Sequence, residues 1–172
     1  MAKFGEALPI ILTHEGGYVN RHEDLGGETY EGIARKFHPD WEGWPFIDAA
    51  LCEGESLNDI QELPGLVESF YQGEFWDHIK GDAIENQDVA NLIIDCGVVC
   101  GTGTAVKLMQ KAAGVSADGA MGPHSIAAIN EQEADGLIAT FRVDWADYFR
   151  GIVERHPDQH VFLAGWLNRA RG

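Results

Sequence analysis

The run from Val89 to Cys100 is apolar on nearly every side when it is wound as a helix. A helix without a polar face must be covered by other elements, so this run predicts a central, buried helix. Asp95 is the one acid within it. A lone carboxylate in such a place must be paired, hydrogen-bonded or neutral, so Asp95 is either a structural anchor or a residue of a functional site.

The rest of the chain predicts helices separated by turns. A first helix is expected to begin near Leu8, with Pro9 in its first turn, and to end at Glu15. The other helices expected from periodicity or from an opening proline cover residues 30–37, the stretch after Pro64, residues 102–112, the stretch after Pro123 and residues 134–155. Because residues 17–30 are polar and rich in turn formers, the predicted fold class is mainly α, with at most a small β-hairpin near residues 17–30.

Glu15 is a carboxylate in an unusual position. The side chains that share one face of the first helix are Leu8, Ile11, Leu12 and Glu15. Gly16 and Gly17 follow at once and are expected to end the helix. A carboxyl group half withdrawn from water has a raised pKa and can donate a proton near neutral pH, which makes Glu15 a candidate general acid. The alternative is that Glu15 lies on a solvated rim of the helix.

Asp24 and Thr29 follow in a polar, glycine-rich segment. One carboxylate in an apolar setting and one in a hydrated setting are what glycoside hydrolysis requires, because one must donate a proton while the other stays ionised. The alternative for Asp24 is ordinary turn chemistry in Asp24-Leu25-Gly26-Gly27.

Three short motifs carry a resemblance to a known family: residues 14–20 (HEGGYVN), residues 24–27 (DLGG) and residues 29–33 (TYEGI). Together they resemble the signature of the N-acetylmuramidases of glycoside hydrolase family 108, which have a lysozyme-like fold. The resemblance implies that Glu15 is the catalytic acid and that Asp24 and Thr29 occupy the next two catalytic positions. The residues that it offers for substrate binding are Tyr18, Asn20, Tyr30, Trp76 and Asp95. For Trp76 the alternative is a place in the core.

The C-terminal half shows a second resemblance. The pattern Asp118-Gly119 followed by Gly122-Pro123, and the ending Gly165-Trp166 with Arg169, are similar to the peptidoglycan-domain half of the same family. We therefore expect a single lysozyme-like domain over residues 1–172. Within it, residues 1–84 would form the catalytic half and residues 85–172 the peptidoglycan-domain half, packed together.

Three aromatic side chains lie close together in the sequence, at Trp41, Trp44 and Phe46. Two interpretations stand side by side. They could stack on sugar rings, or they could form a hydrophobic plug under a loop.

Charge and cysteine content exclude several classes of protein. The net charge is −16, which argues against a nucleic-acid-binding protein. The charge is uneven, since residues 1–140 carry a net −17 and residues 141–172 a net +1. The odd number of cysteines, Cys52, Cys96 and Cys100, argues against a disulfide framework. Cys96 and Cys100 lie four residues apart on a predicted helix, where buried free thiols are favoured over a metal site. No cofactor, metal or membrane insertion is expected, and the chain is expected to be a monomer.

The resemblance implies a peptidoglycan hydrolase that cleaves the β-1,4 bond between N-acetylmuramic acid and N-acetylglucosamine. The alternatives are a lytic transglycosylase and a wall-binding module without catalysis. The N-terminus shows no secretory signal, so we expect synthesis in the cytoplasm and action on the cell wall after release through a holin pore or by dedicated export.

Overall fold

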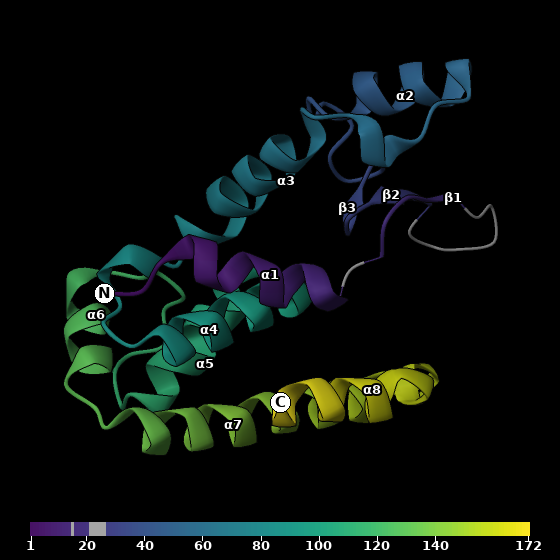
Figure 1. The fold of residues 1–172 in the computed structure, drawn as a ribbon. Helices are drawn as coiled ribbons and strands as arrows, with labels where there is room; N and C mark the ends of the chain where they lie inside the picture. Colours follow the sequence, from purple (N-terminus) through teal and green to yellow (C-terminus); the bar gives the residue numbers. More distant parts are fainter. Residues whose placement is uncertain (15, 21–26) are drawn as a thin grey trace. The chain divides into compact units, whose positions relative to one another are not determined.

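The computed structural model describes residues 1–14, 16–20 and 27–172. Its contacts divide the chain into two compact units (Figure 1). The sheet unit comprises residues 8–74, and the helical unit comprises residues 1–7 and 75–172. The predicted mainly α character is confirmed, because helices make up most of the described chain and the strands form only one small three-stranded sheet there.

Helix α1 runs over Phe4–His14 and contains Pro9 in its interior. The expected start near Leu8 is therefore wrong. The helix has one more turn than expected, before Leu8, and hydrogen bonds hold the chain that leads into this turn. The Ala2 amide donates to the Ile84 carbonyl at 2.7 Å, and the Lys3 amide donates to the Gln87 side chain at 2.7 Å. Phe4 is also buried. These contacts offset the hydrogen bond that an interior proline removes from a helix.

The predicted hairpin is present and gains a third strand. Strands β1 (Val19–Asn20), β2 (Glu28–Tyr30) and β3 (Ile33–Ala34) form an antiparallel sheet in the order β1-β2-β3. The helix expected over residues 30–37 is wrong, because Glu31 and Gly32 form a tight turn between β2 and β3. Both have positive φ, 46° and 79°, as two-residue hairpin turns require. The Tyr71 hydroxyl donates to the Glu31 carbonyl at 2.7 Å.

The remaining helices of the sheet unit are α2 (Trp44–Glu53), the short 3₁₀ helix η1 (Leu57–Asp59) and α3 (Leu63–Tyr71), followed by the wide turn η2 (Gln72–Trp76). The sequence predicts α3 through Pro64, which lies in its first turn, but gives no prediction of α2. Trp44 and Ile47 of α2 are buried, as are Leu63 and Val67 of α3.

The helical unit contains η3 (Gly81–Ala83), α4 (Gln87–Cys100), α5 (Thr102–Ala112), α6 (Pro123–Asn130), α7 (Ala134–Arg155), η4 (Pro157–Gln159) and α8 (His160–Arg171). The predicted central helix is confirmed, since α4 packs on both α5 and α7 and most of its apolar residues are buried. The bounds predicted for α7 are also confirmed. Figure 1 shows α8, which the sequence analysis does not predict, running back beside α7.

The side chain of Gln110 holds the turn that the Asp-Gly motif of residues 118–119 forms. Its side chain is 1% exposed, its Oε1 accepts from the Gly119 amide at 2.9 Å, and its Nε2 lies 2.8 Å from Asp118 Oδ1 and 2.9 Å from Ser125 Oγ. Gly119 has φ +86°, a conformation that favours glycine. In the described structure the motif therefore builds the turn between α5 and α6.

Replacing Gln110 with alanine should lower the free energy of unfolding by about 2–4 kcal/mol, because buried polar groups lose their partners and a cavity forms. Urea denaturation followed by circular dichroism measures this. Gln132→Ala, at an exposed position of the same unit, is the matched control and should change stability by less than about 0.5 kcal/mol. Equal losses in the two variants would contradict the structural role of Gln110.

Candidate active site

The two predicted catalytic carboxylates, Glu15 and Asp24, lie outside the described residues. The described backbone shows what precedes and follows them in the chain. Helix α1 ends at His14, directly before Glu15. Asn20 at the end of β1 pairs with Glu28 at the start of β2, and Asp24 belongs to the stretch that connects these paired positions.

Thr29 lies on the opposite face of the sheet from Asn20 and Tyr30. Thr29 pairs with Val19 of β1 and with Ala34 of β3, so these three side chains share one face. Glu28 and Tyr30 lie on the opposite face because side chains alternate along a strand. Thr29 is partly exposed, and it stays a predicted catalytic residue on its own face of the sheet.

Tyr18 and Asn20 belong to a polar cluster on the face that carries Glu28. The Tyr18 hydroxyl donates to Glu28 Oε1 at 2.9 Å, and Asn20 Nδ2 donates to the Tyr18 hydroxyl at 3.2 Å. Partial burial raises the pKa of Tyr18, and the carboxylate of Glu28 adds to that rise. The phenol therefore keeps its proton and acts as a hydrogen-bond donor at neutral pH.

Arg35 completes this cluster, and the sequence analysis does not single it out. Its Nε lies 2.6 Å from Glu28 Oε2, and its two terminal nitrogens donate to Asp48 of α2 at 3.0 and 2.6 Å. The guanidinium also lies over the Trp44 ring, 4.3 Å from the ring centre. Arg35 thus ties β2 to α2 and holds the Glu28 carboxylate in place beside Tyr18. Only a contact between distant segments of the chain reveals this role.

Replacing Arg35 with glutamine should lower the melting temperature by about 2–4 °C at pH 7 and by less at pH 3. The hydrogen bond from Arg35 holds the pKa of Asp48 below its ordinary value. A carboxylate whose pKa is lower in the folded chain stabilises the fold above about pH 4, and this contribution is lost as the pH falls through the lowered pKa.

Circular dichroism melts at both pH values measure the effect of the Arg35 substitution. Arg150→Gln removes an exposed ion pair with Asp147 and serves as the control, with an expected shift below about 1 °C. A melting-temperature difference for Arg35→Gln that is as large at pH 3 as at pH 7 would contradict the assignment to Asp48.

Tyr30 is buried, contrary to its predicted role in substrate binding. It is 8% exposed, and its ring stacks on Trp41 with centres 6.1 Å apart. Burial raises the pKa of Tyr30 as well. Trp41 in turn meets Trp44 edge to face at 5.1 Å. Trp44 is 2% exposed, so the plug interpretation holds for Trp44, whereas Trp41 is partly exposed.

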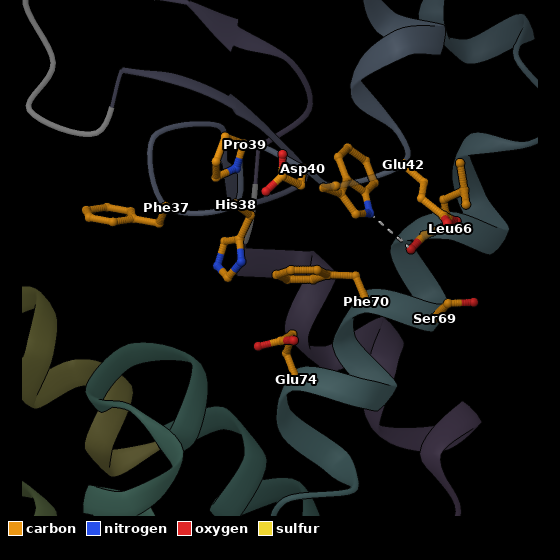
Figure 2. Close-up of a pocket in the computed structure, with 10 residues that line it drawn as sticks. Phe37, His38, Pro39, Asp40, Glu42, Leu66, Ser69, Phe70 and Glu74 are labelled. Carbon is orange, nitrogen blue, oxygen red and sulfur yellow. Dashed lines mark hydrogen bonds between the residues drawn. The ribbon is translucent and has the colours of Figure 1, made fainter.

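Trp41 lines a groove of about 440 Å³ that lies wholly within the sheet unit (Figure 2). The side chains that line it are aromatic, acidic or small, and are those of Phe37, His38, Pro39, Asp40, Trp41, Glu42, Leu66, Ser69, Phe70 and Glu74. The His38 ring meets Phe70 edge to face at 4.7 Å, and Trp41 Nε1 donates to the Leu66 carbonyl at 3.4 Å. Phe37 is 68% exposed. Aromatic faces beside carboxylates suit a sugar, whose ring has apolar C–H faces and a rim of hydroxyl donors.

Trp76 lies in the core of the helical unit, where it cannot offer a ring face to a sugar. The side chain is 1% exposed, its Nε1 donates to Asp82 Oδ1 at 2.8 Å, and its ring centre lies 5.6 Å from that of Phe4. A Cβ atom at Gly81 would come within 2.2 Å of the indole ring, which explains the glycine there. The predicted substrate contact of Trp76 is therefore corrected to the alternative role in the core.

Asp95 is paired, as its position in an apolar helix requires. Its Oδ1 accepts from Arg169 Nε at 3.1 Å and from Arg169 Nη2 at 2.7 Å. Both side chains are largely shielded from water. This pair joins α4 to α8, which favours the anchor interpretation of Asp95 over the substrate contact.

The cysteines and other metal-ligand side chains form no metal site within residues 1–14, 16–20 and 27–172, because no three His, Cys, Asp or Glu side chains there lie close enough to hold an ion. All three cysteines are free thiols. Cys96 is buried and Cys100 partly so, and Cys52 is exposed. None of the described helices is long and apolar enough to cross a bilayer.

Comparison with known protein families identifies the class of protein to which this chain belongs. A family model described as a predicted peptidoglycan domain matches residues 104–171, and one described as glycosyl hydrolase 108 matches residues 8–101. The two matches define a glycoside hydrolase with a peptidoglycan-domain half. The chain belongs to glycosyl hydrolase family 108 and carries that family's peptidoglycan-domain half, as the sequence motifs predict.

Two individual proteins are similar to this chain. An uncharacterized protein of Methanocaldococcus jannaschii is 33% identical over 67 residues, which are 38% of this chain and 28% of that protein. The structure of Brucella abortus SagA matches with a TM-score of 0.63 at 24% identity, covering 97% of this chain and 92% of that chain. The SagA match concerns the fold alone, and the predicted lysozyme-like, mainly α fold class is confirmed. The division of roles between residues 1–84 and 85–172 stays a prediction.

Proposed function

We propose that this glycoside hydrolase is a muramidase that hydrolyses the β-1,4 bond between N-acetylmuramic acid and N-acetylglucosamine. The observation that carries the proposal is the match of the glycosyl hydrolase model over residues 8–101. That range contains Glu15, Asp24 and Thr29 together with the motifs that surround them. The peptidoglycan-domain match over residues 104–171 supports the wall polymer as the substrate.

Glu15 is the proposed proton donor to the glycosidic oxygen. Ile11 is fully buried on α1, and Glu15 stands four residues after it, at the spacing that places side chains on one helical face. A carboxyl group on an apolar face keeps its proton to higher pH and can release it to the leaving group.

Asp24 is the proposed ionised partner, and Thr29 assists it. Asp24 would steer the attacking water or stabilise the positive charge that develops on the sugar ring. Whether the configuration at the sugar is inverted or retained follows from the gap between the two carboxyl groups, about 6.5–9.5 Å for inversion against about 5–5.5 Å for retention. We propose inversion by analogy with related enzymes.

The polar cluster and the groove of the sheet unit support this proposal by their chemistry. Tyr18 is held as a donor by Glu28, and Asn20 carries an amide that hydrogen-bonds to the same phenol. The groove lined by Trp41 offers aromatic faces and carboxylates, which would hold sugar rings of the substrate. Its acidic side chains would accept hydrogen bonds from sugar hydroxyl and amide groups.

Product analysis tests the reaction. Purified peptidoglycan is digested with the wild-type chain and with Glu15→Gln, and the soluble fragments are examined by mass spectrometry before and after borohydride reduction. New reducing N-acetylmuramic acid ends that depend on Glu15 support the muramidase. Anhydromuramyl ends indicate a lytic transglycosylase, and binding without either product indicates a wall-binding module. Either of these two results would overturn the proposal.

The setting in which the enzyme works also stays a proposal. We infer synthesis in the cytoplasm and action on the wall after release through a holin pore or by dedicated export. Monomeric action on the glycan strand belongs to the same proposal.

A further inference from the structure

Three aromatic rings form a column across α7 and α8 in the helical unit. Phe149 of α7 stacks on Trp166 of α8 with ring centres 5.0 Å apart and planes 18° apart. Trp166 stacks on Phe162, one helical turn earlier, at 5.7 Å and 29°. Figure 1 shows these two helices lying side by side. The column therefore joins two helices of a single unit.

Exposure rises along this column. Phe149 is 2% exposed, Trp166 is partly exposed and Phe162 is 51% exposed. Val161, next to Phe162, is 75% exposed and extends the apolar surface. Phe149 packs in the core, where it contacts Trp166. About half of the Phe162 surface contacts no other residue of the described fold. An apolar surface of this kind marks a binding site more often than isolated exposed residues do.

The occupant that fits this surface is a sugar strand. A β-1,4-linked glucosamine ring carries its substituents around the rim and turns C–H groups to both faces, and such faces stack on aromatic rings. All three rings of the column lie within residues 104–171, the range matched by the peptidoglycan-domain model. That match says which polymer this half of the chain meets, but not where on its surface.

Charge supports the same occupant. Peptidoglycan carries carboxylates on its stem peptides, so negative charge on a protein repels it. Residues 1–140 carry a net −17, but residues 141–172, which contain the column, carry a net +1. The segment that carries the column therefore adds no net repulsion of its own. A second copy of the chain is a poorer occupant, because two molecules of net −16 repel each other.

We propose that the exposed side of Phe162, backed by Trp166, forms a stacking site for the glycan strand of peptidoglycan, on residues other than those proposed for cleavage. The site rests on the proposed substrate but not on the proposed chemistry. It would hold the strand while the sheet unit acts on it, and it would raise the time that each enzyme molecule spends on an insoluble wall.

The experiment measures binding in a Glu15→Gln background, so that cleavage does not change the substrate. The probe is purified sacculi free of teichoic acid, and bound protein is quantified by co-sedimentation over a range of sacculi concentrations. Phe162→Ala should weaken binding about fivefold, as expected for the loss of one stacked ring. Phe162→Trp should restore it. Val143→Ala removes an apolar side chain that is 60% exposed on α7 of the same unit and is the matched control, with unchanged binding.

A second probe separates the sugar from the peptide. A hexamer of N-acetylglucosamine has no stem peptide and no lactyl group, and its binding is followed by tryptophan fluorescence. In a Trp41→Phe background, which removes the indole of the groove in the sheet unit, Trp166 should respond to the hexamer, and adding Phe162→Ala should raise the sugar concentration for half the response about fivefold. Circular dichroism melts check that every variant is folded.

Three results would overturn the stacking site: full binding of sacculi by Phe162→Ala, failure of Phe162→Trp to restore it, or a wild-type dimer that Phe162→Ala dissociates without a change in sacculi binding. Failure of the proposed cleavage is a different result. It would show as an absence of reducing ends in the wild-type digest, with these binding measurements unaffected.

Discussion

Replacing Glu15 with glutamine should lower the rate of reducing-end release from purified peptidoglycan by about 10²–10⁴-fold. This range is what a positioned general acid contributes to a reaction, and glutamine has a similar shape but no proton to donate at neutral pH. The rate is measured by a reducing-sugar assay at matched concentrations of folded enzyme. Binding of sacculi should persist in the variant, since the substitution removes a proton donor and leaves the aromatic column intact.

Glu6 provides the matched control for this experiment. It lies on the same helix α1, is exposed, and forms an ion pair with Lys3 at 3.3 Å. Glu6→Gln should keep the wild-type rate to within about twofold, because an exposed ion pair contributes little to stability. Full activity of Glu15→Gln, or an equal loss in both variants, would contradict the assignment of Glu15 as the acid.

Replacing Trp76 with alanine should lower the free energy of unfolding by about 3–5 kcal/mol, the cost typical of removing a large aromatic side chain from a core. The indole is 1% exposed and hydrogen-bonded to Asp82, and a ring contact with Phe4 adds to its packing. Urea denaturation measures the loss. The activity per folded molecule should stay near the wild-type value, since a core residue acts through stability.

Two further variants test the same core site. Trp76→Phe keeps most of the apolar volume but loses the hydrogen bond to Asp82, so it should cost less than the alanine variant. Gly81→Ala should also destabilise, because the added methyl group would come within 2.2 Å of the indole ring. A Trp76→Ala variant of normal stability and poor substrate binding would restore the substrate role that the structure argues against.

Helical periodicity predicts the largest elements well. The bounds of α7 and the central position of α4 follow from long apolar patterns that no local feature contradicts. The error at residues 30–37 has a local cause, because Glu31-Gly32 makes a two-residue turn that a helical reading of the segment overlooks. The late start predicted for α1 takes account of Pro9. It does not take account of the hydrogen bonds that Ala2 and Lys3 form with residues far away in the sequence.

Some residues of the candidate site can likewise be identified from local sequence, whereas others can be identified only from contacts between distant segments. Motifs around Glu15 and Asp24 are contiguous in sequence, so a resemblance could assign them roles. Arg35 and the groove beneath Trp41 depend on residues brought together from separate segments, and no spacing rule identifies them. Trp76 and Asp95 show what a sequence motif cannot predict. A motif gives the residue type at a position, but it does not tell whether the side chain faces the substrate or the core.

The hydrogen bond from Tyr71 to the Glu31 carbonyl makes α3 a remote determinant of strand register. Glu31 adopts a backbone conformation that is costly for a residue with a Cβ atom, and a partner 40 residues away helps to hold it there. A slip of one position between β2 and β3 would exchange the two faces of the sheet and turn Thr29 to the side now occupied by Glu28. Selection for catalysis at the sheet would then also act on the buried phenol of Tyr71.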